Sequence, residues 1–95
     1  MVEREKNTAT STEIAEWMLR QFEAIGWLRQ SNVAVQILTK FGDKYVYRNK
    51  NRNYAINKDI LDEFRRITPD NVVWSRSRQQ WRRRRAGDPP GRMVR

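Results

Sequence analysis

The chain has 95 residues and carries 20 Lys and Arg side chains against 11 Asp and Glu, which gives a formal net charge of +9. It contains neither cysteine nor histidine, which excludes disulfide frameworks, zinc fingers and catalytic triads built on a histidine base. The length fits one domain with a modest core, and no run approaches the ~18–20 apolar residues of a membrane span. We therefore expect a soluble, cytoplasmic protein that needs no cofactor and does not contact a membrane.

The first element predicted along the chain is a helix that follows a flexible N-terminus. Residues 1–9 are polar and lack periodicity, as frayed termini do. Thr10 and Glu13 have the spacing of a capping box, which marks a helix start. Gly26 stands where a left-handed residue commonly ends a helix. The apolar stripe between them is Ile14, Trp17, Met18, Phe22 and Ile25.

A second helix, a hairpin and a third helix are expected next. Ser31 can cap a helix that runs to about Phe41. Segments 44–48 and 53–56 have strand character, and the polar tip between them predicts a β-hairpin, since asparagine tolerates the left-handed turn conformation. Asn57 can cap the third helix. Two short apolar segments, Trp27-Leu28 and Val72-Val73-Trp74, are predicted strands, the latter being the last.

The positive charge is concentrated at the end of the chain. Residues 71–95 hold eight arginines and one acid, Asp88, whereas residues 1–70 hold twelve basic and ten acidic side chains. The sequence thus predicts a small single α+β domain over residues 10–75, with the order helix, helix, β-hairpin, helix and strand. A basic tail, rich in Trp and Arg and then in Pro and Gly, would follow over residues 76–95, with residues 87–91 extended or disordered.

Such a tail suits a polyanion, most often nucleic acid. Arginine binds phosphate oxygens in bidentate fashion, and tryptophan offers a flat face to an unstacked base. The candidate contacts in the tail are Arg76, Arg78, Trp81, Arg82, Arg83, Arg84 and Arg85. The alternatives are that Trp74 belongs to the core, that Trp81 folds back over the body while the arginines stay solvated, and that the basic run serves solubility or protein docking.

Two further surfaces could bind nucleic acid. Cations at every second position of the hairpin tip would share one face if strand geometry persisted, and could grip a phosphate backbone. A charged tip could equally keep hairpin edges from pairing with other chains. Polar residues of the second helix could read base edges in a major groove, or form an ordinary solvated face. These candidates are Arg48, Lys50 and Arg52 at the tip, and Asn32, Gln36 and Lys40 on the helix.

Metal binding and catalysis have weaker support in the sequence than nucleic-acid binding. Asp59, Asp62 and Glu63 have helical spacing that permits a Mg²⁺ site, but acids in the first turns of a helix are ordinary partners of its dipole, so we expect no metal site. A histidine-free ribonuclease could use cations and a tyrosine as proton carrier. Tyrosines of a small hairpin are usually half-buried core, so we expect no catalytic residue. The set for such an enzyme would be Lys44, Tyr45, Tyr47, Arg48 and Tyr54.

The order of elements loosely resembles the winged-helix modules of transcription regulators. Those modules place a separate recognition helix between the second helix and the hairpin, where this chain has only Gly42 and Asp43. A closer resemblance is to a family of small uncharacterised bacterial proteins. The residues that carry it are Phe41-Gly42, Tyr45-Val46-Tyr47, Asn49, Asn51, Asn53, Ala55-Ile56, Val72-Val73-Trp74, Arg76, Trp81-Arg82 and Asp88. This resemblance implies a bacterial or phage origin and a compact body, and it supplies no activity.

The sequence therefore predicts a non-enzymatic protein that binds DNA or RNA. The alternative is a protein–protein interaction module, either a homodimer or a domain that docks on an acidic protein surface. Trp27, next to Gly26 in a short connection, is the first candidate for an aromatic residue that faces a protein partner.

Overall fold

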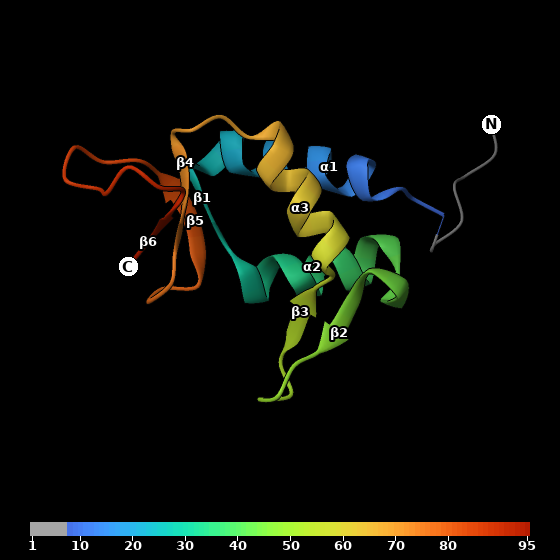
Figure 1. The fold of residues 1–95 in the computed structure, drawn as a ribbon. Helices are drawn as coiled ribbons and strands as arrows, with labels where there is room; N and C mark the ends of the chain where they lie inside the picture. The colour runs from blue at the N-terminus through green and yellow to red at the C-terminus, as the bar shows by residue number, and fades with distance from the viewer. Residues whose placement is uncertain (1–7) are drawn as a thin grey trace.

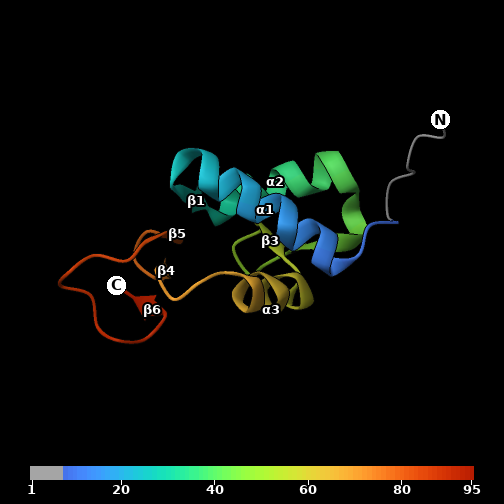
Figure 2. The ribbon, with the colours of Figure 1, turned by 90° about the horizontal axis from the view of Figure 1, so that it is seen from above.

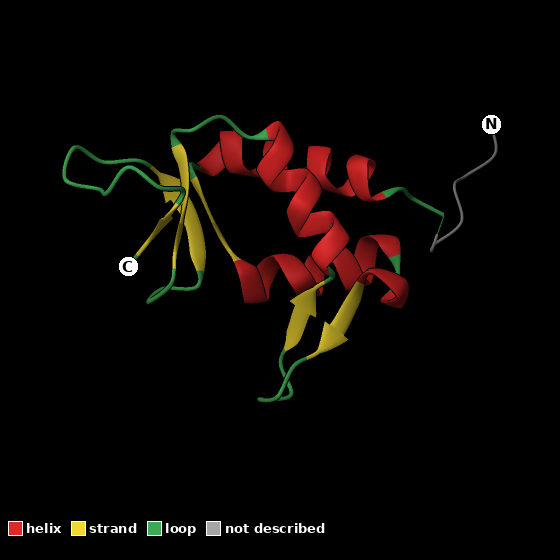
Figure 3. Cartoon of the chain, viewed as in Figure 1, coloured by secondary structure: helices red, strands yellow, loops and turns green. Residues whose placement is uncertain are grey.

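The computed structural model describes residues 8–95 and has an α+β fold, as the sequence predicted (Figure 1). Predictions for residues 1–7 lie outside the described residues. The elements are α1 (Ser11–Ile25), β1 (Trp27–Arg29), α2 (Gln30–Phe41), the 3₁₀ helix η1 (Asp43–Tyr45), β2 (Val46–Arg48), β3 (Tyr54–Ile56), α3 (Lys58–Ile67), β4 (Val72–Ser75), β5 (Gln80–Arg83) and β6 (Met93–Val94). The helices lie together, a four-stranded sheet stands at one end of them, and the β2–β3 hairpin projects separately (Figure 3).

Local signals fixed both ends of α1 where the sequence placed them. The Thr10 hydroxyl accepts the backbone N–H of Glu13 at 3.1 Å, and a Glu13 carboxylate oxygen accepts the Thr10 N–H at 3.5 Å. Gly26 adopts a left-handed φ of 86°, and its N–H donates to the Phe22 carbonyl at 2.6 Å. This φ favours glycine because a side chain would clash there.

The core lies where α3 packs against α1. The largest side chains buried there are Ile14, Met18 and Phe22 of α1, Ile37 of α2, and Ile60 and Phe64 of α3. Two hydroxyls of the first turn of α1 donate to carboxylates of α3: Ser11 to Asp59 and Thr12 to Glu63, each at 2.6 Å. Apolar burial therefore holds the two helices together, and the polar pairs align their ends. Figure 2 shows α3 next to α1.

The cap predicted for α2 is wrong, and the cap predicted for α3 has the right position but lacks the side-chain bond. The residue before α2 is Arg29, which makes no side-chain capping bond, so Ser31 lies inside the helix. Asn57 precedes α3, but its side-chain amide donates to the Lys44 carbonyl at 2.8 Å instead of capping. That bond connects α3 to η1. A tertiary contact has replaced the local one that the sequence suggested.

The hairpin is shorter than predicted, and its turn is built differently. Strand pairing covers only Val46–Arg48 and Tyr54–Ile56. The Asn49 side-chain oxygen accepts the backbone N–H groups of Asn51 and Asn53 at 2.9 and 3.1 Å. The residue with positive φ is Arg52, at 63°, and not an asparagine. Asparagine thus stabilises the turn with its side-chain acceptor rather than with its backbone conformation.

The four-stranded sheet contains the main departure from the sequence-based organisation. Its strand order is β1-β5-β4-β6, with β5 antiparallel to both neighbours and β6 parallel to β4. Two of these four strands come from residues 76–95, which the sequence separated from the domain as a tail. Val72-Val73-Trp74 is a strand, as predicted, but two more strands follow it.

Trp81 is the residue of β5 that ties the sheet to the helices. It pairs with Leu28 on one side and with Trp74 on the other, so the three side chains share one face. Its ring centroid lies 5.1 Å from that of Phe64 and 4.7 Å from that of Trp74. Trp81 thus folds back over the body, which was one of the alternatives left open by the sequence. Within residues 8–95, no helix is long and apolar enough to cross a membrane.

We expect the substitution Trp81→Ala to lower the free energy of unfolding by about 3 kcal/mol, because it removes the side chain that fills the junction of sheet and helices. Urea unfolding followed by circular dichroism measures this loss. Trp27→Ala is the matched control, since Trp27 lies on the neighbouring strand with 44% of its surface exposed, and should cost about 1 kcal/mol or less. Equal losses would contradict a central role for Trp81.

Candidate functional site

The run Arg82–Arg85 does not act as one cationic block, because its members face different surroundings. Arg82 has only 11% of its side chain exposed and forms two hydrogen bonds of 2.9 Å with the Asp88 carboxylate, which is 10% exposed. Asp88 also accepts the backbone N–H of Arg85 at 2.6 Å. This bidentate pair is largely shielded from water, so Arg82 serves the fold.

Two more arginines of the predicted tail bind carbonyl oxygens. The Arg84 guanidinium donates to the carbonyls of Asp70, Pro89 and Gly91 at 3.0, 2.6 and 2.9 Å. Arg92 donates to the Val72 carbonyl at 2.8 Å and to the Thr68 hydroxyl. These bonds and the Arg82–Asp88 pair hold residues 84–92, here called the 84–92 loop, against the sheet and α3. The Pro- and Gly-rich stretch is therefore fixed by side chains.

The remaining tail arginines are exposed. Arg76 and Arg78 lie in the turn that joins β4 to β5, and neither side chain has a partner among residues 8–95. Exposed Arg29 ends β1 opposite Gln80, at the same end of the sheet. We call Arg29, Arg76 and Arg78 the cationic turn. Arg83 and Arg85 are also exposed, although the Arg83 guanidinium lies 5.1 Å from the Phe22 ring centroid and is partly engaged there.

The hairpin tip presents fewer free cations than its sequence suggested. Strand geometry stops at Arg48, so the predicted sharing of one face by alternate residues is wrong. The Arg48 guanidinium donates to the Arg52 carbonyl and the Tyr54 hydroxyl at 2.9 and 3.1 Å, and lies 4.4 Å from the Tyr54 ring centroid. Lys50 and Arg52 remain exposed. The tip and the cationic turn point to the same side of the molecule, the lower side in Figure 1.

The polar candidates of α2 form an exposed stripe. Asn32, Gln36 and Lys40 are four residues apart along the helix, and all three are exposed. The buried residues Val33, Ala34 and Ile37 occupy the opposite face. The spacing predicted from the sequence therefore holds, and the stripe is available to a partner.

The acidic cluster of α3 is divided among separate partners. Asp59 accepts from Ser11, and Lys58 lies 2.7 Å from Asp62. Glu63 accepts two bonds of 2.9 Å from Arg66 besides that of Thr12, and these bonds lower its pKa to about 2. Among the described residues, no three acidic side chains gather as metal ligands do.

The tyrosines considered for a histidine-free ribonuclease do not lie on one face of the hairpin. Tyr45 is buried in η1, and its hydroxyl donates to the Ala9 carbonyl at 2.8 Å. Arg48 pairs with Tyr54, whereas Tyr47 pairs with Ala55, so Tyr47 and Tyr54 point to opposite faces of the hairpin. The hydroxyls therefore do not converge on one reacting group.

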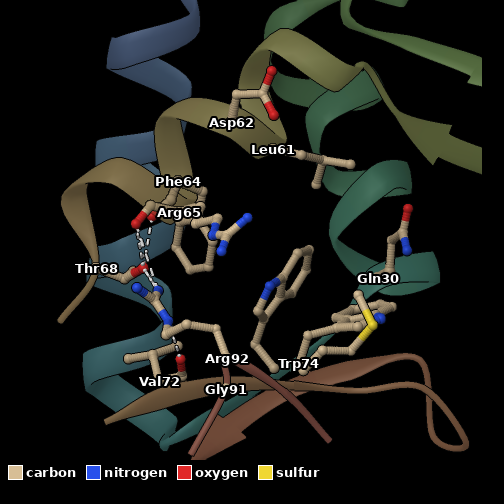
Figure 4. A pocket seen from close by; sticks show the side chains of 12 residues that line it. Gln30, Leu61, Asp62, Phe64, Arg65, Thr68, Val72, Trp74, Gly91 and Arg92 are labelled. Atoms are coloured by element: carbon tan, nitrogen blue, oxygen red, sulfur yellow. Dashed lines mark hydrogen bonds between the residues drawn. The ribbon is translucent and has the colours of Figure 1, made fainter. Parts of the chain in front are cut away.

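A pocket of about 470 Å³ opens between α3, the sheet, the start of α2 and the 84–92 loop (Figure 4). Its walls are mostly apolar and include Leu61, Phe64, Val72, Trp74, Trp81 and Met93. Its volume lies within the range of small-molecule sites. The sequence left open whether Trp81 is a base platform or folds back over the body, and it favoured Trp74 as core, but it indicated no pocket shared by both. Only the pairing of β4 with β5 brings them together.

A family model covers residues 10–83, and its description is "Family of unknown function (DUF6953)". The chain therefore belongs to this family, which agrees with the resemblance to uncharacterised proteins seen in the sequence. It matches no curated protein and no solved structure. The winged-helix resemblance stays a hypothesis.

We expect part of the acid sensitivity of the fold to come from Asp88. Its bonds from Arg82 and from the Arg85 backbone hold the pKa of Asp88 well below the ordinary ~3.9 of an unfolded chain. Between the unfolded and the folded pKa of Asp88, the folded state binds fewer protons at this carboxylate than the unfolded state does. The stability that Asp88 contributes is therefore present above pH 4 and is lost as pH falls through the folded pKa. Thermal unfolding from pH 6 to pH 2 should show a falling Tm.

Asp88→Asn should lower Tm at pH 6 and weaken its further fall towards pH 2. Glu63→Gln is the comparison, because the pKa of Glu63 is also lowered, to about 2. The double variant should have the flattest profile, since the two carboxylates have different partners. A profile for Asp88→Asn parallel to that of the unmodified chain would contradict the assignment.

Proposed function

We propose that this member of the DUF6953 family is a nucleic-acid-binding protein without catalytic activity, of bacterial or phage origin and cytoplasmic. The observation that supports it best is the cationic turn. Three guanidinium groups stand at one end of the sheet, and those of Arg76 and Arg78 have no partner within residues 8–95. Free guanidinium groups bind phosphate strongly because they form paired, charge-assisted hydrogen bonds.

The exposed cations of the hairpin tip support the same partner. The hairpin tip that carries Lys50 and Arg52 points to the same side as the β4–β5 turn. The stripe of Asn32, Gln36 and Lys40 belongs to α2, from which η1 leads into the hairpin. Phosphate contacts position a protein on nucleic acid, whereas amide side chains can read base edges. In this proposal the turn and the tip supply affinity, and α2 supplies any selectivity.

The winged-helix hypothesis becomes more consistent if β4–β5, rather than β2–β3, is taken as the wing. α3 then takes the recognition-helix position before the wing, with η1 and the β2–β3 hairpin inserted between α2 and α3. In this version of the hypothesis α3, rather than α2, would face the groove. The cationic turn becomes the wing tip. Outward-facing residues of α3 carry both charge signs, as the Lys58–Asp62 and Arg66–Glu63 pairs illustrate. α3 therefore adds little net charge to the grip.

We expect binding to a random 20-base-pair duplex to weaken with salt at a log–log slope of about −4.5, from five contacting cations. Fluorescence anisotropy across a salt series measures it. The double variant Arg76→Gln/Arg78→Gln should make the slope shallower by about 1.5–2. The control Arg20→Gln/Lys58→Gln removes the same charge from exposed positions on α1 and α3, and should change the slope much less. Equal changes in slope for the two double variants would mean that binding depends on overall charge and not on contacts made by the cationic turn.

The second candidate function is protein–protein interaction, and it has its own observation. Ile25 and Trp27 flank Gly26 with 58% and 44% of their surfaces exposed, beside β1, which is an edge strand. Exposed apolar side chains next to an unpaired strand edge suit a homodimer or a docked partner.

For this second function we expect light scattering after size-exclusion chromatography to give about twice the monomer mass of 11.5 kDa, and Trp27→Ser to return the monomer mass. A monomer at all concentrations tested would leave nucleic-acid binding as the proposed function.

A further inference from the structure

We propose that the pocket between α3 and the four-stranded sheet accepts one unstacked base of a single-stranded nucleic acid. This inference rests on the proposed function and specifies its ligand. The pocket has an aromatic wall, a cationic rim and a free amide, and these three features match the three parts of a nucleotide.

The aromatic wall comes from the paired tryptophans. Trp74 and Trp81 lie on the same face of the sheet with ring centroids 4.7 Å apart and planes at 57°, so they form a corner. Phe64 meets Trp81 edge-on at 5.1 Å and fixes its ring from the side of α3. Trp74 is only half-buried, so part of it remains accessible. A base that stacks on an aromatic ring gains binding free energy whatever its identity.

The polar groups of the rim stand on opposite sides of the pocket (Figure 4). Arg65 lies on the α3 side and is exposed, and its guanidinium has no partner within residues 8–95. Gln30 lies on the α2 side, and its side-chain amide likewise makes no hydrogen bond to a described residue. An amide that can donate and accept suits the edge of a base, and a free guanidinium suits its phosphate.

The rim is continuous with the cationic turn. The backbone N–H of Gln30 donates to the Gln79 carbonyl at 2.9 Å, and Gln79 follows Arg78 directly. Arg65 stands on one side of the pocket, and Arg76 and Arg78 lie beyond the other. A strand that places one base in the pocket therefore has cations for the phosphates before and after that base.

Charge favours this occupant over an apolar peptide. Asp62 is the acid that lines the pocket, and its charge is countered by Lys58 at 2.7 Å. Arg92 also lines the pocket, but its donors are bound to Val72 and Thr68, so it adds charge without being free to reorient. A flat aromatic group bearing adjacent negative charge fits these surroundings. A neutral apolar side chain would leave the Arg65 charge without a partner.

The test compares two single-stranded DNA decamers, one with all its bases and one in which every nucleotide is abasic, and uses the full chain. Fluorescence anisotropy should show the intact strand binding about tenfold more tightly, the size expected from one stacked base. Trp74→Leu should abolish this difference while keeping an apolar wall. Trp27→Leu, on the neighbouring strand β1, should retain it.

The Arg76→Gln/Arg78→Gln variant separates this inference from the proposed function, because it should weaken both strands by the same factor and retain the difference. Equal binding of the intact and abasic strands by the unmodified chain would overturn the pocket while leaving the proposed function in place. No binding of single strands or duplex at low salt would overturn both.

The indole N–H signals give an independent readout by NMR. Signals of Trp74 and Trp81 should shift with the intact strand and not with the abasic one. A shift at Trp74 produced by an uncharged tryptophan-containing peptide, but by neither strand, would assign the pocket to a protein partner and overturn the proposal.

Discussion

The position of Trp81 between Leu28, Trp74 and Phe64 is the interaction on which the rest of the structure depends. β1 and β4 do not pair with each other, and β5 is the strand that joins them. The indole also contacts Phe64 of α3. Leu28 and Trp81 pair although they are far apart in the sequence. The four-stranded sheet can therefore form only after the chain between them has folded back. The geometry of the pocket and of the cationic turn follows from the same pairing.

Elements controlled by neighbouring residues could be predicted from the sequence, and those controlled by distant residues could not. The ends of α1 could be predicted from Thr10, Glu13 and Gly26, because capping bonds act within one turn of helix. Asn57 had the same local potential, but its amide meets the Lys44 carbonyl, thirteen residues away. The strand β5 was missed because its arginines gave Gln80–Arg83 the composition of a solvated arm. Nothing local shows that Trp81 has a partner on each side.

The candidate site was predictable to a similar extent. Exposure of Arg76 and Arg78 agrees with the free cations expected of a binding arm, and the α2 stripe has its predicted spacing. The inward roles of Arg82, Arg84 and Arg92 depend on acceptors that only the folded chain supplies: the Asp88 carboxylate, the Thr68 hydroxyl and carbonyls on both sides of the 84–92 loop. A guanidinium has five donors, so one residue can satisfy several loop carbonyls that lack regular backbone partners. Formal charge therefore overstates the charge this segment offers to a partner.

The two connections on either side of β5, the turn before it and the 84–92 loop after it, differ in how much their sequences can vary. The 84–92 loop is closed by Arg82 and Asp88 and fastened by Arg84, so a change in its length would separate groups whose bonds hold it. In the turn before β5, the side chains of Arg76 and Arg78 make no bond within residues 8–95 that the sheet requires. Mutation could therefore change the charge and reach of that turn while the scaffold stays intact. The family match covers residues 10–83 and so includes this turn. The turn is therefore a position at which charge and length can vary without a new fold.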